Sequence, residues 1–239
     1  MLTVTPAGVC WTRKGETVLL DCETGDLKWS ASLGANETLS APVEQDGTVF
    51  TASRSKLYAL RSDSGDCLWH RTLANDSAVF TPLPPFLKAS AGKLLIASRR
   101  AAGGGLLQCV DPGAREVLWT RETPAPINLH ADADRVYLRS QALAAYDVRT
   151  GTPLWTAKVG GCGPLAFQDG RVYLADPKGR YSLLALDARS GKPVWHHSTV
   201  ASCGGIVING ETGFVSGSDG RLHAVLLATE RKGRGRQYL

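Results

Sequence analysis

The stretch Ala145-Tyr-Asp147-Val-Arg-Thr-Gly151-Thr-Pro-Leu-Trp155 decides the fold, because the chain repeats it. The same pattern returns as Ala185-Leu-Asp187-Ala-Arg-Ser-Gly191-Lys-Pro-Val-Trp195. Three earlier copies keep parts of it: Asp21…Gly25…Trp29, Ala59…Gly65…Trp69, and Asp111…Trp119, in which the glycine moves to Gly113. A repeat of about 40 residues built from strand-like segments is typical of a β-propeller.

Each repeat reads as four short strands. In the clearest copy we expect strands at 164–167, 171–174, 182–186 and 192–196. Asp-Gly and Asn-Gly pairs, which favour tight hairpins, fall between the first two strands at Asp169, Asp46 and Asn209. No window shows a sustained helical period of apolar residues. The sequence therefore predicts an all-β chain.

The repeats fill the chain as a single β-propeller domain with six four-stranded blades. We expect the blades at 1–33, 37–73, 77–122, 125–159, 162–199 and 202–239. The sixth has no tryptophan where the motif requires one, and residues 228–239 form a basic tail. The chain could therefore also be a portion of a seven- or eight-bladed ring, and we expect 228–239 to be its least protected part.

The recurring residues have physical roles in such a fold. A tryptophan near the end of an outer strand can stack on the next blade, while its N–H needs an acceptor. The glycine supplies the positive φ of a tight turn, and the aspartate can accept hydrogen bonds from the turn backbone. We therefore expect the tryptophans to dock between blades; they are Trp29, Trp69, Trp119, Trp155 and Trp195.

Charge and composition limit the classes of partner that the chain is expected to bind and the cellular compartment in which it is expected to reside. The net charge is +5, and the tail supplies over half of it, so no basic stripe suits nucleic acid. No apolar run is long enough for a membrane span, and the N-terminus lacks the features of a secretory signal. The six cysteines form no Cys-x-x-Cys pair and fit free thiols better than disulfides. These features favour a cytoplasmic location, with an excised extracytoplasmic domain as the alternative.

The motif resembles the tryptophan-docking motif of the pyrroloquinoline quinone (PQQ) repeat family, and its copies cover essentially the whole chain. That family includes quinoprotein alcohol dehydrogenases, outer-membrane assembly lipoproteins and PQQ-like domains appended to bacterial serine/threonine kinases. The dehydrogenases of the family use a vicinal cysteine disulfide and a calcium ion. This chain has no Cys-Cys pair and no loop rich enough in acidic residues for a calcium cage. We therefore expect no PQQ, no other cofactor and no metal. We expect the kinase-appended type as the nearest analogue, since no lipid-modified N-terminal cysteine appears.

Candidate binding residues come from the loops on one face and from the channel. The loop-face candidates are Arg99, Arg100, Arg139, Arg180 and His197, and the channel candidate is Asn128. Arg99 and Arg100 precede Ala-Ala-Gly-Gly-Gly on the one long loop between second and third strands, and long loops are often functional. Cys162 and Cys203 occupy equivalent positions in blades five and six. We expect them to serve as small residues where the blades crowd together near the axis of the channel.

Two histidine-containing stretches look like metal sites but have simpler interpretations. His196 and His197 alternate along a strand, so their rings face opposite sides of the sheet. Asp132 and Asp134, beside His130, fall at a hairpin turn where aspartate is common. No nucleophile or phosphate-loop motif is present. We therefore expect no catalytic residues.

These observations lead to one functional hypothesis and one alternative. The leading hypothesis is a noncatalytic scaffold or sensor that binds a protein partner or a small ligand on the loop face. The alternative is a small-molecule enzyme that uses histidine and arginine residues at the mouth of the channel.

Overall fold

A computed structural model gives the fold of the chain. It describes residues 2–34, 37–73, 84–100, 103–159, 165–175, 183–197, 203–217 and 219–227. All the regular structure among them is β-strand, and none of these residues belongs to a helix that could cross a membrane. The chain divides into two compact units, one of residues 1–136 and 147–152, the other of 137–146 and 153–239.

The first three sheets belong to the first unit, and each has four strands in chain order. The strands of the first are β1 (Leu2–Thr5), β2 (Gly8–Arg13), β3 (Glu16–Leu20) and β4 (Leu27–Ser32). Those of the second are β5 (Val43–Gln45), β6 (Thr48–Ala52), β7 (Lys56–Arg61) and β8 (Cys67–Thr72). Those of the third are β9 (Phe86–Ser90), β10 (Lys93–Arg99), β11 (Gly105–Asp111) and β12 (Glu116–Thr123).

The fourth sheet contains the boundary between the units, and the last two sheets belong to the second unit. The fourth sheet has β13 (Asn128–Ala131), β14 (Arg135–Arg139), β15 (Leu143–Asp147) and β16 (Pro153–Ala157). The fifth has β17 (Leu165–Gln168), β18 (Arg171–Ala175), β19 (Leu183–Asp187) and β20 (Pro193–His197). The sixth has three described strands, β21 (Cys203–Asn209), β22 (Thr212–Gly217) and β23 (Leu222–Leu226).

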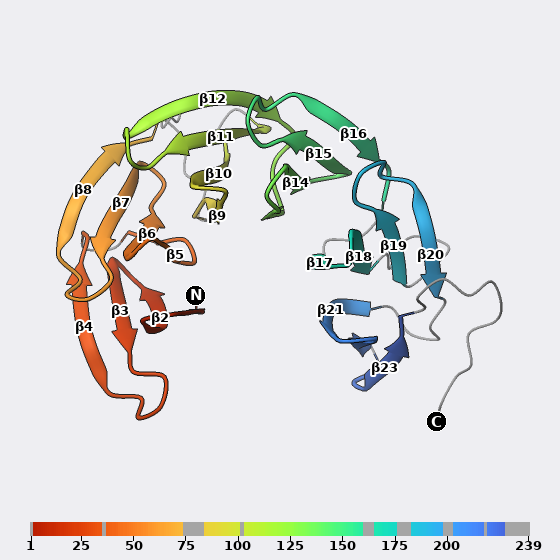
Figure 1. The fold of residues 1–239 in the computed structure, drawn as a ribbon, viewed down its shortest axis with the longest axis horizontal. Helices are drawn as coiled ribbons and strands as arrows, with labels where there is room; N and C mark the ends of the chain where they lie inside the picture. The colour runs from red at the N-terminus through yellow and green to blue at the C-terminus, as the bar shows by residue number, and fades with distance from the viewer. Residues whose placement is uncertain are drawn as a thin grey trace. The chain divides into compact units, whose positions relative to one another are not determined.

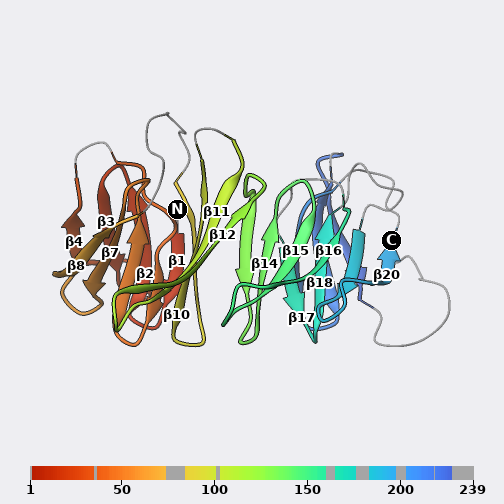
Figure 2. The same ribbon diagram turned by 90° about the horizontal axis from the view of Figure 1, so that it is seen from above.

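Within each sheet, neighbouring strands pair antiparallel and follow one another through short turns. The first sheet illustrates this in Figure 1, where β4 lies on the outer side of β3 and β3 on the outer side of β2. Figure 2 shows the strands from the side, running up and down between turns at the two edges of the sheets. We refer to the six sheets as blades one to six. The predicted fourth strand of blade six and the tail 228–239 lie outside the described residues.

The core consists of apolar layers between consecutive blades. Blades one and two share Cys10, Leu19, Trp29, Val49 and Leu60. A second layer joins blades two and three. In the other unit, similar layers join blade four to blade five and blade five to blade six. A strand alternates its side chains between two faces, so each blade buries both faces only when it has a neighbour on each side.

A β-bulge recurs at one place in five blades. The pairing of the third and fourth strands shifts by one residue just before the motif tryptophan. The extra residue lies on the fourth strand and is Lys28, Leu68, Leu118, Leu154 or Val194. Bulges bend a strand and redirect its side chains. This bulge therefore sets the direction in which each tryptophan points.

Candidate functional site

Each of three motif tryptophans docks on the turn of the blade that follows it in the chain. Trp29 Nε1 donates to the carbonyl of Ser62 at 2.9 Å, and Trp119 Nε1 donates to that of Val148 at 3.0 Å. Trp155 Nε1 donates to the carbonyl of Ala188 at 3.1 Å. The acceptor is always the residue after the motif aspartate or, in blade two, after Arg61, which replaces it. The docking direction is therefore fixed along the chain.

The motif glycines allow the tryptophan rings to approach. Gly65, Gly151 and Gly191 have φ values of +77°, +67° and +68°, which side chains rarely adopt. A Cβ atom built on them would come within 2.6, 2.6 and 2.5 Å of the rings of Trp29, Trp119 and Trp155, respectively. All three glycines are buried. Glycine is required at these positions both for its backbone conformation and for the absence of a Cβ atom.

The motif aspartates hold the turns in shape. Asp147 Oδ1 accepts from the backbone N–H groups of Thr150 and Arg149, both at 2.9 Å. Asp187 Oδ1 accepts from both the hydroxyl and the N–H of Ser190 at 2.7 Å. These bonds favour the ionised form, so the pKa of Asp147 is lowered mainly by the Thr150 N–H and that of Asp187 mainly by the Ser190 hydroxyl. We call a motif glycine and the acceptor carbonyl beside its aspartate a docking seat.

Blade three has a different docking seat. Arg115, not Gly113, stands at the glycine position and takes a left-handed φ of +59°. Its guanidinium lies over the ring of Trp69, 5.8 Å from the ring centroid. The Arg71 guanidinium also donates to the carbonyl of Arg115. A cation–π contact therefore replaces the glycine contact at this position.

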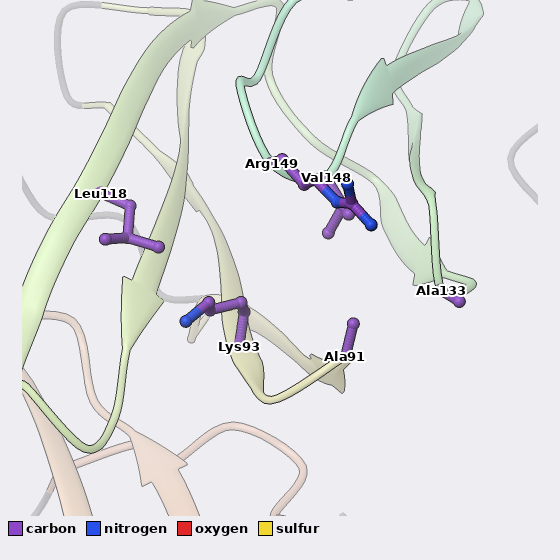
Figure 3. Close-up of a pocket in the computed structure, with 6 residues that line it drawn as sticks. All are labelled: Ala91, Lys93, Leu118, Ala133, Val148 and Arg149. Atoms are coloured by element: carbon purple, nitrogen blue, oxygen red, sulfur yellow. The ribbon is translucent and has the colours of Figure 1, made fainter.

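An apolar pocket lies beside the docking turn of blade four, within the first unit. Its volume is about 300 Å³, and it is lined by Ala91, Lys93, Leu118, Ala133, Val148 and Arg149. Figure 3 shows that Leu118 comes from a strand on one side and Val148 and Arg149 from a turn on the other. Lys93 Nζ lies 2.6 Å from Asp111 Oδ2, whereas Arg149 is exposed. The pocket can accept an apolar side chain next to an acidic group.

Three of the binding residues predicted from the sequence lie in the first unit, and two of them are held by the protein itself. Arg99 Nε donates to the carbonyl of Pro126 at 2.9 Å, on the segment leading to Asn128 at the start of β13. Arg100 Nη1 lies 2.6 Å from Glu122 Oε1. The Arg100 N–H donates to the Gly104 carbonyl at 3.1 Å, and β11 begins at Gly105. The connection between β10 and β11 is therefore residues 100–104, of which 101 and 102 lie outside the described residues.

The other predicted binding residues belong to the second unit or are not described. Arg139 is completely buried at the end of β14, so it is not a surface residue of the loop face as expected. His197 lies on β20, where its ring stacks on Trp195 with an interplanar angle of 8°. Burial and the neighbouring His196 lower the pKa of His197. Arg180 lies outside the described residues.

The stretches that resemble metal sites serve structural roles in the described chain. Asp132 Oδ1 accepts from the N–H groups of Asp134 and Arg135, at 2.9 and 2.7 Å. Burial lowers the pKa of His130 to about 4. Among the described residues, no group of three or more His, Cys, Asp or Glu side chains could hold a metal ion. Cys10, Cys22, Cys67 and Cys109 are free thiols, and Cys162 lies outside the described residues.

The pocket and the bulge were not anticipated from the sequence. A signal was nevertheless available, because an apolar residue precedes the tryptophan in four of five copies: Leu68, Leu118, Leu154 and Val194. These side chains remain about half exposed in the structure. A position that is repeatedly apolar yet exposed indicates a surface with a role beyond the core.

Comparison with known protein families identifies proteins to which this chain is similar. The family model described as outer membrane protein assembly factor BamB matches residues 4–103 and 103–232. The protein of that name from Moranella endobia is 24% identical over 229 residues, which are 85% of this chain and 55% of that protein. The one from Yersinia pestis is 25% identical over 206 residues, 78% of this chain and 50% of that protein. The chain thus spans about half the length of the curated relatives it matches.

Solved structures confirm the predicted fold class. BamB from Moraxella catarrhalis superposes with a TM-score of 0.65 at 18% identity, over 96% of this chain and 72% of that one. The WD40 domain of Neurospora crassa Pan2 superposes with a TM-score of 0.66 at 10% identity, over 94% and 73%. A computationally designed protein, Ika8, reaches 0.71 at 14% identity, over 97% and 71%. The chain is an all-β propeller.

These matches confirm the expected PQQ-like repeat family and are to its assembly-factor type. They also correct one expectation. The expected cytoplasmic location is wrong, because the matching proteins are named for the assembly of outer membrane proteins, which takes place at the cell envelope. With three tryptophan–glycine docking contacts and a family match over nearly its whole length, the chain belongs to the PQQ-type repeat family of the outer membrane protein assembly factor BamB.

Proposed function

We propose that this chain is a noncatalytic scaffold that binds a protein partner during the assembly of outer membrane proteins. The observation that carries the proposal is the apolar pocket beside Leu118, in a chain of this family. Leu118 is 46% exposed on the outermost strand of blade three, so a partner can reach it without any change in the propeller.

The pocket's lining suggests what it binds. Leu118, Ala91 and Ala133 offer apolar surface beside the buried Val148, and the exposed Arg149 lies at the turn. An apolar side chain of the partner would fill the cavity, and a neighbouring carboxylate would pair with the guanidinium. Burial of a leucine-sized side chain contributes about 1.5–3 kcal/mol, which suits one anchor within a larger interface.

The enzyme alternative finds little support in the described residues. An enzyme would bring titratable side chains together in a deep pocket. Arg139 is instead enclosed, Arg99 and Arg100 contact their own blade or its neighbour, and His197 stacks on a tryptophan. A small-molecule ligand or a sensor role on the loop face stays a prediction.

Site-specific photocrosslinking tests the proposal. A photoreactive residue replaces Leu118 in cells that make the protein, and adducts are identified by mass spectrometry. The matched control carries the same residue at Val194, which has the same bulge position and is 51% exposed but does not line the pocket. We expect an adduct with an envelope protein at position 118 that Arg149→Glu weakens.

The comparison of positions 118 and 194 shows whether the pocket has a specific partner. Equal adduct patterns at positions 118 and 194 would show that the pocket has no special partner. An adduct formed only with cytoplasmic proteins would contradict a role in outer membrane protein assembly.

A further inference from the structure

The sequence Leu-Trp-x-Arg occurs twice, on the outermost strands of two consecutive blades. It reads Leu68-Trp-His-Arg71 on β8 of blade two and Leu118-Trp-Thr-Arg121 on β12 of blade three. The other motif tryptophans lack the arginine, and the residues at its position are Ala31, Ala157 and His197. The two blades therefore share a feature that the docking motif itself does not require.

The arginine of each sequence binds the turn of the next blade. The Arg71 guanidinium donates to the carbonyl of Arg115 in the turn of blade three. Arg121 Nε donates to the carbonyl of Gly151 at 2.9 Å, and its Nη2 donates to that of Thr150 at 3.3 Å, both in the turn of blade four. Each arginine therefore lies beside its tryptophan, at the contact between the outermost strand and the following turn.

Each of these turns presents a second arginine next to a half-exposed leucine. Arg115 is exposed and lies over the ring of Trp69, beside Leu68. Arg149 is also exposed and lines the pocket together with Leu118. The two leucines are 48% and 46% exposed. We call these two sets the leucine–arginine junctions: Leu68, Arg71 and Arg115 form the first, and Leu118, Arg121 and Arg149 form the second.

The junctions carry positive charge that no neighbouring carboxylate balances. In the part of the chain that the structure describes, none of their four guanidinium groups forms an ion pair. Asp147 instead accepts from backbone N–H groups, and Asp111 pairs with Lys93. The turn of blade two differs, because Asp63 stands there and pairs with Arg61 at 2.6 Å. Two neighbouring sites thus combine an accessible leucine with two arginines available to an anionic partner.

We propose that the two leucine–arginine junctions bind one extended segment of a partner protein, a segment with two apolar side chains flanked by acidic residues. One apolar side chain enters the pocket beside Leu118, and the other contacts Leu68. The acidic residues pair with the guanidinium groups, which match carboxylates in geometry and charge. The proposal rests on the function proposed above and deepens it, since it gives the chemistry of the partner and a second contact site.

A protein segment fits these junctions better than an anionic membrane surface does. The apolar site of the second junction is a cavity of about 300 Å³, which suits a single side chain. Arg71 and Arg121 are held by backbone carbonyls, and Arg115 is held against an aromatic ring. Helices that lie on membranes instead present a continuous apolar face with long cations extending beside it.

Photocrosslinking at both junctions tests the proposal. A photoreactive residue replaces Leu68 or Leu118 in separate variants of the full chain, made in cells, and the crosslinked peptides are sequenced by mass spectrometry. Arg115→Gly then removes one cation of the first junction. The φ of Arg115 is +59°, which glycine adopts without strain, so the turn keeps its shape. Thermal unfolding verifies that this variant is folded.

Two control variants accompany Arg115→Gly. Arg115→Lys keeps the positive charge at the same place. Arg189→Gln removes one charge from the turn of blade five, where Leu154 is half exposed but Ala157 replaces the arginine of the junction.

We expect both positions to crosslink to the same segment of one envelope protein, with acidic residues beside the crosslinked side chains. Arg115→Gly should lower the yield of the adduct at position 118 by at least about fivefold, because the loss of one linked anchor weakens binding at the other. Residue 115 does not line the pocket, so this effect reports on the link between the junctions. Both control variants should give yields close to that of the wild type.

The outcomes separate this inference from the function on which it rests. An adduct at position 118 without one at 68, or adducts with different proteins, would overturn the inference alone. An adduct at 118 that Arg115→Gly does not weaken would do the same. Lipid adducts at both positions would identify a membrane surface as the occupant and overturn it as well. The absence of any envelope-protein adduct at 118 would contradict the proposed function and, with it, this inference.

Discussion

At the scale of single residues, the motif glycines allow two effects of a substitution on stability to be measured separately. One is the backbone strain of a positive φ, and the other is the clash of the new Cβ atom with a docked tryptophan ring. Gly191 and Gly25 have φ values of +68° and +77°, so alanine at either position meets backbone strain. Only at Gly191 does the new Cβ also strike a ring, at 2.5 Å from Trp155. The pair therefore distinguishes the cost of conformation from the cost of the blade contact.

We expect Gly191→Ala to lower the free energy of unfolding by about 2–4 kcal/mol, from strain plus overpacking. Gly25→Ala should cost only about 1–2 kcal/mol, from strain alone. Urea denaturation of the two variants and the wild type provides the comparison. Equal losses would show that Trp155 yields freely and that its contact with Gly191 contributes little.

His130 makes stability depend on pH. Burial, with Lys88 nearby, lowers its pKa to about 4, and Asp132 opposes this only partly. The unfolded chain takes up this proton near pH 6.5 and the folded chain only near pH 4. Its contribution to stability is therefore complete above pH 6.5 and is lost as the pH falls toward 4.

We expect His130→Gln to reduce the loss of stability between pH 7 and 4.5, on the order of 1–2 kcal/mol. His197, whose pKa is also lowered, keeps part of the effect in the variant. Urea midpoints measured across this range test the expectation. A pH profile identical to that of the wild type would mean that the imidazole is solvated in the folded protein.

At the scale of the element, the β-bulge matters more than the residue that occupies it. Leu154 is half exposed, so Leu154→Ala should cost less than about 1 kcal/mol. Deletion of Leu154 removes the bulge and turns Trp155 away from Gly191. The deletion should cost about 3–5 kcal/mol, as much as Trp155→Ala.

Thermal or urea unfolding of the three variants checks this order. Deletion of an exposed residue in a turn, such as Thr152, would not serve as a control, because the turn itself forms the seat. The appropriate comparison is Trp155→Ala. If deletion of Leu154 destabilised the protein no more than Leu154→Ala does, the tryptophan would dock without the bulge.

The strands were predictable because their turns and alternation are local. Asp169-Gly170 indicates a hairpin, and φ values of +49° and +69° at these residues fit the tight turn expected there. The bulge was missed, since the spacing from aspartate to tryptophan does not by itself show which residue is left unpaired, and its one signal was the apolar residue before the tryptophan. The pairing of Arg99 with Gly105 was also missed, because the sequence assigns both residues to a loop and the structure includes them in β10 and β11.

The candidate site was harder to predict, because it depends on contacts between distant segments. Arg115 looks like an ordinary turn residue, yet it covers Trp69 from the next blade. Arg139 looks like a loop arginine, yet it is enclosed at a strand end. The pocket beside Leu118 forms from four separate segments, and the sequence of any one of them does not indicate the other three.

At the scale of the whole molecule, the chain shares the repeat fold of quinoproteins, and we expect that it does not share their cofactor chemistry. Calcium requires about six to eight oxygen ligands. The described residues hold no cluster of even three His, Cys, Asp or Glu side chains suited to a metal, and no two cysteines are adjacent in the sequence. Titration with PQQ and calcium should therefore give no shift of the quinone absorbance and no dye-linked alcohol oxidation. Binding at micromolar affinity, with alcohol turnover, would contradict this expectation.

The fixed direction of docking also has a consequence for synthesis on the ribosome. Trp29 is made before its acceptor Ser62, which follows 33 residues later, and Trp155 precedes Ala188 by the same interval. Because synthesis proceeds at about 5–20 residues per second, roughly two to seven seconds pass between the synthesis of each tryptophan and that of its acceptor carbonyl. While it is being synthesised, a chain of this kind therefore has an undocked tryptophan ring near its growing end. A holdase chaperone can bind that ring until the turn that buries it has been made.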